Sequence, residues 1–101
     1  MFGTIGHARM KSAAAAKEMT ALTDEWKRTI RPQIPGPVLE LMGTVSGHPD
    51  QVVFVALVQD EQTYRALANN PDQDKWYRRM VELMDGDVTW EDVNLDLAIN
   101  D

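Results

Sequence analysis

The segment from Gln51 to Gln59, QVVFVALVQ, carries apolar side chains on both faces of a predicted strand. Because side chains alternate along a strand, Val52, Phe54, Ala56 and Val58 share one face, and Val53, Val55 and Leu57 share the other. Such a strand needs a cover on each face. A chain of 101 residues with about two helices can cover only one face, so we expect the other face to pack on a second copy.

Composition and charge exclude several classes of protein. The hydrophobic fraction of 44% is enough for one packed core, so we expect a single domain over residues 1–101. A formal net charge of −6 argues against nucleic acid or an anionic membrane surface as a partner. The absence of cysteine excludes disulfides, thiolate catalysis and cysteine-based metal sites. No signal peptide and no membrane-length apolar run is visible, so we expect a soluble cytoplasmic protein.

The first half of the chain predicts a strand, a helix and a second strand. The first strand covers Phe2 to Met10, where Gly3 and Gly6 indicate close approach of another group. A helix begins after Ser12, a favourable N-cap, and ends near Pro32. Its apolar stripe is Ala15, Met19, Leu22, Trp26 and Ile30. The second strand runs from Val38 to Val45, after a proline and glycine turn.

The second half predicts a hairpin, helices and a last strand. A loop over 46–50 joins the second strand to the doubly apolar third strand. Asp60 can cap a short helix, and Asn70-Pro71 restarts a longer helix, with Gln73 at a capping-box-like spacing. Alternation at Val93, Leu95, Leu97 and Ile99 predicts a final strand over Val88 to Ile99.

This order predicts an α+β fold, the ferredoxin-like βαββαβ sandwich. An antiparallel four-stranded sheet would carry its helices on one face, with the third strand in the centre beside the first and second strands. The other sheet face would be a large apolar patch, which is unusual for a monomer. Packing of two such faces would produce a homodimer, a dimeric α/β barrel.

The chain resembles the dimeric α/β barrel superfamily, in particular the antibiotic biosynthesis monooxygenase-like group. Three features carry the resemblance: a helix with Trp26 followed by the Pro35-Gly36 turn, the doubly apolar third strand, and a helix that opens with Asn70-Pro71-Asp72 and continues through Trp76-Tyr77. The group includes cofactor-free monooxygenases, haem-degrading enzymes, isomerases and proteins of no known activity. Fold analogy does not choose among these.

The resemblance implies a small, mostly apolar ligand in a cavity between the sheet and the helices. It also implies that cofactor-free members oxidise aromatic substrates with molecular oxygen. Haem-degrading members use a strand asparagine and a helix histidine. In this chain the corresponding strand position is closest in character to His7, and no histidine occurs from Asp60 to Gly86, so haem degradation is not expected.

His7 and Glu40 are the candidate acid–base groups. His7 lies in the middle of its strand, where a histidine could deprotonate a phenolic or enolic substrate, or could be a core or interface residue. Glu40 is a lone charge in an apolar strand and either lines the cavity or faces solvent on an edge strand. The two strands would lie about 10 Å apart, so a direct dyad is not expected. With His48 in a loop and no third ligand, we expect no metal site.

The aromatic residues of the predicted helices are candidate ligand contacts. Tyr64, Trp76 and Tyr77 are placed there, and adjacent residues on a helix point about 100° apart. An aromatic stripe is either core or cavity wall. We therefore predict a cofactor-free monooxygenase or isomerase with His7 as base and these aromatic residues shaping the pocket. The alternative is a non-catalytic dimer that binds a small ligand or a protein.

Overall fold

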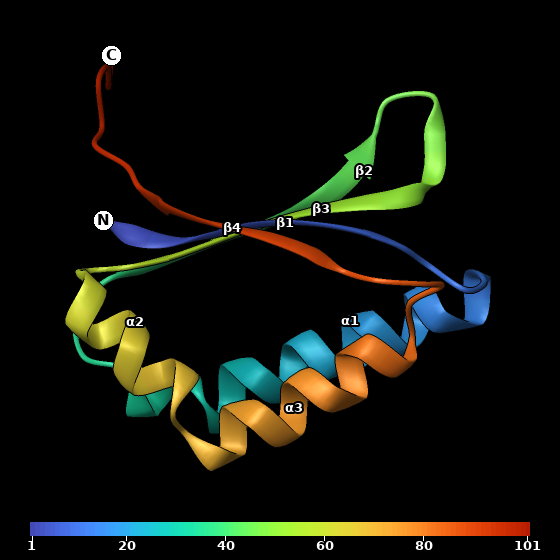
Figure 1. Cartoon of the computed structure of the whole chain (residues 1–101), viewed down its shortest axis with the longest axis horizontal. Coiled ribbons are helices and arrows are strands. Elements are labelled where there is room, and N and C mark those ends of the chain that lie inside the picture. The colour runs from blue at the N-terminus through green and yellow to red at the C-terminus, as the bar shows by residue number, and fades with distance from the viewer.

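The computed structural model describes the whole chain, residues 1–101. Its elements are β1 (Phe2–Arg9), α1 (Ala13–Thr29), the 3-10 turn η1 (Arg31–Gln33), β2 (Val38–Val45), β3 (His48–Val58), α2 (Glu61–Ala68), α3 (Pro71–Glu82) and β4 (Thr89–Asn94). The sheet lies on one side and the helices on the other (Figure 1). The predicted α+β order is confirmed, with the second helical region divided into α2 and α3.

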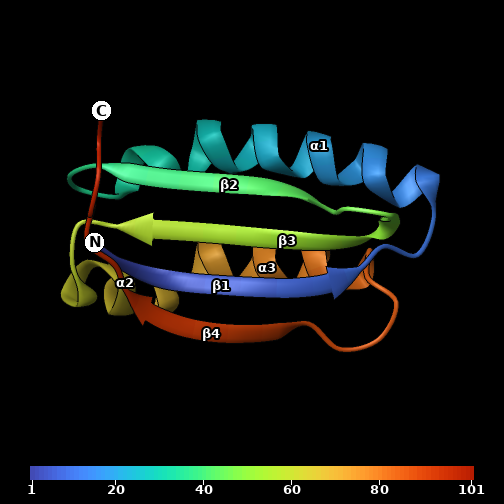
Figure 2. The same cartoon turned by 90° about the horizontal axis from the view of Figure 1, so that it is seen from above.

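All neighbouring strands are antiparallel, in the order β2-β3-β1-β4 (Figure 2). The doubly apolar β3 is therefore central, between β2 and β1, as predicted. One cross-strand row joins Glu40, Ala56, Thr4 and Asp92, and the next joins Met42, Phe54, Gly6 and Trp90. Because side chains opposite one another share a sheet face, each row projects from a single face.

The three α-helices begin at the predicted caps. Ser12 accepts a hydrogen bond from the amide of Ala15, at 3.1 Å, and Asp60 and Asn70 cap α2 and α3 in the same way. These side chains satisfy N–H groups that the first turn of a helix leaves free. Gln73 does not complete the predicted capping box at α3. Its Oε1 instead accepts the indole N–H of Trp26, at 2.8 Å, because the cavity side of α3 packs on α1.

The hydrophobic core lies between the sheet and the helices. All five residues of the predicted α1 stripe are buried. Four of them, all except Ala15, belong to one cluster with residues of β3 and α3; its central members are Met19, Leu22, Trp26, Ile30, Val52, Phe54, Val58, Trp76 and Met80. Burial of this apolar surface is the main favourable contribution to folding. No helix in the structure combines the length and hydrophobicity that a membrane-spanning segment requires.

The opposite sheet face has no helix over it (Figure 1). It carries Ile5, Val53, Val55 and, on the edge strand β2, Leu39 and Leu41, which are 44% and 57% exposed. Chain-terminal residues Leu97 and Ile99 add further exposed apolar surface, and the C-terminal segment leaves the sheet on the side away from the helices.

Two predicted boundaries are wrong. The hairpin loop over 46–50 is a two-residue turn at Ser46 and Gly47, because the positive φ of Gly47 permits a tight reversal and β3 already begins at His48. The last strand ends at Asn94, not Ile99. Asn94 pairs with Phe2 of β1, and the amide and carbonyl of Leu95 both bond to Met1.

The predicted close approach at Gly3 and Gly6 is confirmed. A Cβ atom at Gly3 would collide with the backbone carbonyl of Ala56 on β3, and one at Gly6 would collide with the indole ring of Trp90 on β4. Only a residue without a side chain lets these neighbours lie so close. Gly6 therefore determines where the ring of Trp90 can lie.

Candidate functional site

A cavity of about 350 Å³ lies between the helix-facing side of the sheet and the helices. Its floor includes Thr4, Phe54 and Ala56, and its helical walls come from all three α-helices. Every aromatic residue of the chain except Phe2 lines it: Trp26, Phe54, Tyr64, Trp76, Tyr77 and Trp90. A volume of this size falls within the range of small-molecule sites, which are mostly apolar with a few placed polar groups.

Small residues in the two central strands create the space. Thr4 and Ala56 lie opposite one another in β1 and β3, and Gly6 follows on the same face of β1. Because these residues are small, they leave open space above the sheet. Large rings from the helices and from β4 surround that space. The ring of Trp90 tilts over Gly6 and lies 5.9 Å, centroid to centroid, from the rings of both Phe54 and Tyr77.

All three indole N–H groups that line the cavity already have acceptors within the protein. Trp26 donates to Gln73, Trp76 donates to the carbonyl of Leu22 at 2.7 Å, and Trp90 donates to the hydroxyl of Tyr77 at 2.7 Å. A buried indole needs such a partner. The tryptophans therefore form walls of defined orientation and leave hydrogen bonding to other groups.

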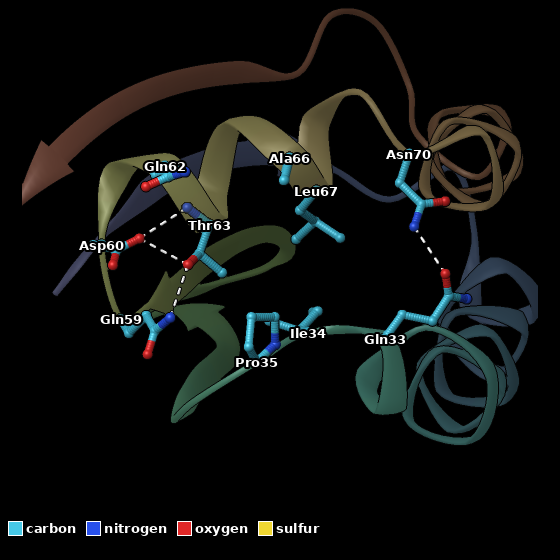
Figure 3. Close-up of a pocket in the computed structure, with 10 residues that line it drawn as sticks. All are labelled: Gln33, Ile34, Pro35, Gln59, Asp60, Gln62, Thr63, Ala66, Leu67 and Asn70. Carbon is cyan, nitrogen blue, oxygen red and sulfur yellow. Dashed lines mark hydrogen bonds between the residues drawn. The ribbon is translucent and has the colours of Figure 1, made fainter.

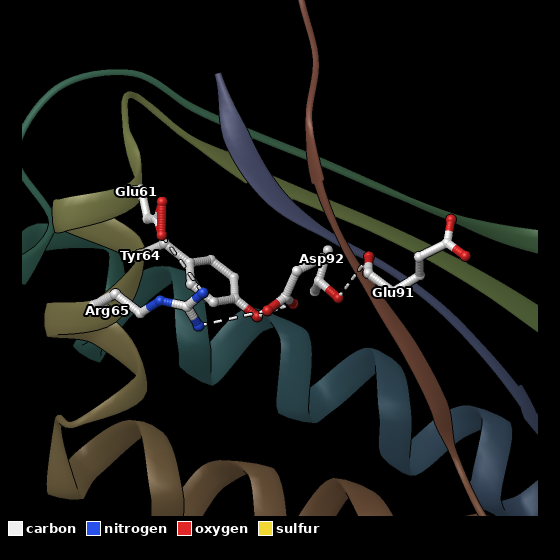
Figure 4. Close-up of polar contacts among 6 residues, drawn as sticks. Glu61, Tyr64, Arg65, Glu91 and Asp92 are labelled. Atoms are coloured by element: carbon white, nitrogen blue, oxygen red, sulfur yellow. Dashed lines mark hydrogen bonds and ion pairs between the residues drawn. The ribbon is translucent and has the colours of Figure 1, made fainter.

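Tyr64 links the cavity to a polar cluster at its edge (Figure 4). Its hydroxyl donates to Asp92 at 2.8 Å, and Asp92 is also paired with Arg65 at 3.4 Å. Partial burial, followed by the bond to Asp92, raises the pKa of Tyr64, while the nearby hydroxyl of Thr4 and the charge of Arg65 oppose the shift. Tyr64 therefore stays protonated, with its proton directed to Asp92.

Glu40 is the acidic group at the other side of the cavity floor. It lies on β2 in the same row as Ala56 and Thr4, so about 10 Å of sheet separates its backbone from that of Thr4. The residue as a whole is exposed at the sheet edge, but it lines the cavity, and its carboxyl group is partly buried. Burial raises the pKa of its carboxyl, and the charge of Lys27 partly opposes that shift. The side chain of Glu40 makes no hydrogen bond or ion pair with another residue, so its carboxyl is free to meet a ligand.

Four of the five predicted site residues meet at this cavity: Glu40, Tyr64, Trp76 and Tyr77. The structure does not bring His7 to them. His7 pairs with Val53 and Thr89 on the sheet face that has no helices, and its side chain is exposed. Its predicted face-mates Ile5 and Arg9 do share that face, but the helices pack on the other one. His7 and Glu40 therefore lie on opposite faces of the sheet and cannot approach the same ligand within this cavity.

Two further residues at the cavity or its edge, Trp90 and Asp92, are not among the predicted site residues. Both lie on the helix-facing side of β4, opposite Gly6 and Thr4. The prediction for this strand used the alternation that begins at Val93, which belongs to the other face. The sequence does contain a signal for them. Trp90 and Asp92 are two residues apart, so they share the strand face opposite to that of Val93.

A second, more polar pocket of about 410 Å³ lies between the β3–α2 connection and the turn that precedes β2 (Figure 3). Its amide side chains already have acceptors within the pocket: Asn70 donates to Gln33 at 2.9 Å, and Gln59 donates to the hydroxyl of Thr63 at 3.1 Å. Asp60 is occupied as the cap of α2, and the bonds from Thr63 lower its pKa. Because these polar groups already have partners, we assign the candidate site to the aromatic cavity.

No group of three or more His, Cys, Asp or Glu side chains in the structure is arranged to hold a metal ion. Within the aromatic cavity the acidic residues are Glu40 and Asp74, and Asp74 is paired with Arg78 at 3.0 Å. The site thus offers an aromatic enclosure, one free carboxyl group and a few neutral hydrogen-bonding groups.

The fold has clear counterparts among solved structures. A protein from Deinococcus radiodurans proposed to be an antibiotic biosynthesis monooxygenase superposes with a TM-score of 0.76 at 18% identity, covering 99% of this chain and 97% of that chain. One from Caulobacter crescentus, proposed to be the same kind of enzyme, gives 0.77 at 11% identity, over 95% and 90%. An uncharacterized NIPSNAP domain protein from Burkholderia xenovorans gives 0.63 at 18% identity, over 100% of both chains.

No protein-family model and no curated protein matches the sequence. At these identities the structural likeness establishes the fold and leaves the activity to be argued from the site. The chain has the ferredoxin-like α+β fold of the antibiotic biosynthesis monooxygenase-like structures.

Proposed function

We propose that this protein is a cofactor-independent monooxygenase that acts on a small aromatic or enolisable molecule held in the aromatic cavity. The observation that carries the proposal is the free carboxyl of Glu40 beside an aromatic enclosure of about 350 Å³. An aromatic wall binds a flat apolar substrate, and a carboxylate can remove an activated proton from it. The names given to the similar structures support an oxygenase over other reactions on this fold.

The chemistry requires a substrate that supplies its own electrons. Glu40 takes one proton from a methylene group that is activated by neighbouring rings or a carbonyl. The resulting carbanion transfers electrons to molecular oxygen, and a carbon–oxygen bond forms. One oxygen atom then remains as a new carbonyl, and the other leaves as water with the two hydrogens of the methylene group. Burial raises the pKa of Glu40, which makes its carboxylate a stronger base than an exposed one.

Anthrone provides a direct test, because it has one methylene group between two rings. We expect the wild-type protein to accelerate oxygen uptake and anthraquinone formation above the spontaneous rate. Loss of a general base typically costs about 100-fold or more, so Glu40→Gln should remove most of this acceleration. Glu91→Gln is the matched control, since Glu91 lies on β4 and projects from the opposite sheet face. Equal rates in the wild type and Glu40→Gln would contradict the role of Glu40.

His7 was predicted from the sequence as the base, and its position now suggests a different expectation. Because His7 projects from the other sheet face, His7→Ala should leave anthrone turnover per folded protein unchanged. Loss of turnover in a His7→Ala variant that retains wild-type assembly would restore His7 to the mechanism and exclude Glu40 as the sole base.

The second candidate function is a non-catalytic dimer that binds a small ligand. The position of His7 on the helix-free face favours it, since this removes the best acid–base residue from the cavity. Binding of an aromatic molecule without oxygen uptake for any enolisable substrate tested would support this candidate over the oxygenase.

We also propose that the helix-free sheet face packs on the same face of a second copy. One apolar surface is formed there by Leu39, Leu41, Val53, Val55 and Ile5. The side chains of Leu39 and Leu41, on the edge strand β2, are each more than two-fifths exposed. An exposed apolar surface of this kind is unusual on a monomer. A two-fold axis would allow the same patch to cover itself, with His7 at the interface.

A further inference from the structure

The polar groups that line the aromatic cavity carry information about the ligand. Three of them are indole N–H groups, and each already donates within the protein. The hydroxyl proton of Tyr64 is directed to Asp92, so Tyr64 presents only its oxygen as an acceptor. Glu40 presents carboxyl oxygens with no partner in the protein. Glu40 on β2 and Tyr64 on α2 therefore offer acceptors to a ligand.

Helix α3 offers neutral donors. The hydroxyl of Tyr77 accepts from Trp90, and its own proton has no acceptor in the structure. Gln73 accepts from Trp26 through Oε1, which leaves its amide N–H groups free. Both residues line the cavity from α3. A neutral oxygen atom on a ligand could accept from either one.

No cationic residue lines this cavity. Lys27, on the last turn of α1, influences Glu40 but is not one of the lining residues. A carboxylate or phosphate group entering the cavity would lose water without gaining a positive partner, and it would approach the carboxyl of Glu40. Burial of an unpaired charge is strongly unfavourable. The lining thus selects against anions.

Resting on the function proposed above, we infer that the cavity takes a neutral, hydroxyl-bearing aromatic ligand whose hydroxyl donates to Glu40, and that it rejects the corresponding aromatic carboxylate. The free donors on α3 would donate to a second oxygen of the same molecule. Glu40 is thus also a specificity-determining residue: it distinguishes a phenol from its ether and its acid, which have similar rings and differ in one group.

Three naphthalene probes separate these features. 2-Naphthol has the donor, 2-methoxynaphthalene has the same ring without the donor, and 2-naphthoate carries a negative charge at neutral pH. All three tryptophans line the cavity, so quenching of tryptophan fluorescence reports its occupancy, and equilibrium dialysis gives the affinity independently. A hydrogen bond to a charged acceptor typically changes affinity by about tenfold or more.

We expect 2-naphthol to bind the wild-type protein at least about tenfold more tightly than either other probe. Glu40→Gln should reduce that preference, because an amide is a weaker acceptor and carries no charge. Glu91→Gln should retain the full preference, since its side chain projects from the opposite face of the sheet.

Equal binding of 2-methoxynaphthalene or 2-naphthoate to the wild type would overturn the inference while leaving the aromatic cavity as a binding site. A preference for 2-naphthol that persists unchanged in Glu40→Gln would overturn the role of Glu40. If none of the three probes binds, the proposed function fails together with this inference. These outcomes therefore distinguish an error in ligand polarity from an error in the site.

Discussion

The indole ring of Trp90 occupies the space in which a side chain at Gly6 would lie. The two residues are directly opposite each other in the β4–β1 pairing, and the ring extends across β1 towards Phe54 and Tyr77. One wall of the aromatic cavity therefore depends on the absence of a side chain on the neighbouring strand.

Gly6→Ala should move the Trp90 ring and weaken its bond to Tyr77. We expect a loss of about 1–3 kcal/mol in the free energy of unfolding, typical of an added methyl group in a packed site. Gly43→Ala is the matched control, because a Cβ at this strand glycine meets no atom within 4 Å. Urea denaturation should show Gly43→Ala within about 0.5 kcal/mol of the wild type. Equal losses in both variants would show that the position of Trp90 does not depend on Gly6.

Glu40 should make stability depend on pH in a defined direction. Burial raises the pKa of the folded Glu40 above its ordinary value of 4.5, so the folded protein holds this proton more tightly than the unfolded chain. Its contribution is favourable below pH 4.5 and is lost as the pH rises through the raised folded value. Glu40→Gln should therefore gain stability relative to the wild type between acidic and neutral pH.

Thermal denaturation of both proteins over this pH range measures the effect of Glu40. Glu91→Gln supplies the baseline for replacing an exposed carboxylate on the same sheet. A difference between the wild type and Glu40→Gln that stays constant with pH would show that the carboxyl is as well hydrated in the folded protein as in the unfolded chain.

The bond between Tyr64 and Asp92 should be visible in the alkaline titration of tyrosine. The chain has two tyrosines, so Tyr77→Phe leaves Tyr64 alone. In that background Asp92→Asn should lower the pKa of Tyr64, because it removes a charged acceptor that holds the proton. Part of the upward shift should remain, since burial is its largest cause. Ultraviolet absorbance of the tyrosinate measures the midpoint, and an unchanged midpoint would contradict the interaction.

A charge on the helix-free face should prevent the proposed self-association. Leu41 is 57% exposed on β2, so Leu41→Lys should retain the fold and abolish the dimer. Ala14→Lys places the same charge at an exposed position of α1 and should remain dimeric. Sedimentation velocity at micromolar concentration measures both. A monomeric wild-type protein would refute the dimer, and a dimeric Leu41→Lys would place the interface elsewhere.

Much of the fold was predictable because its signals are local. The caps Ser12, Asp60 and Asn70 act on amides within three residues, so composition at a single position indicates where each helix begins. The α1 stripe follows from helical periodicity in the same way. The end of β4 was not predictable locally, because it depends on where β1, far away in the sequence, starts.

The site was predictable in its residue types and only in part in its positions. Glu40, Tyr64, Trp76 and Tyr77 stand out as a lone charge in an apolar strand and as large aromatic groups on helices, and the structure gathers them around one cavity. Trp90 and Asp92 were missed because the apolar alternation of the last strand points to its other face. The prediction that His7 lies at the cavity is wrong. The residues around a histidine in the middle of a strand do not indicate which sheet face will meet the helices.

Alternation in the sequence determines which residues of a strand share a face, and every such grouping in β1 and β3 holds in the structure. The sequence also indicates that β3 needs a cover on each side. Tertiary packing decides which face meets the helices. The bulky rings of α1, α2 and α3 pack over the face of β1 that carries the small residues Thr4, Gly6 and Ala8. They do not pack over the face that carries Ile5 and His7. That choice, made by packing volume between distant segments, places Glu40 in the cavity and His7 outside it.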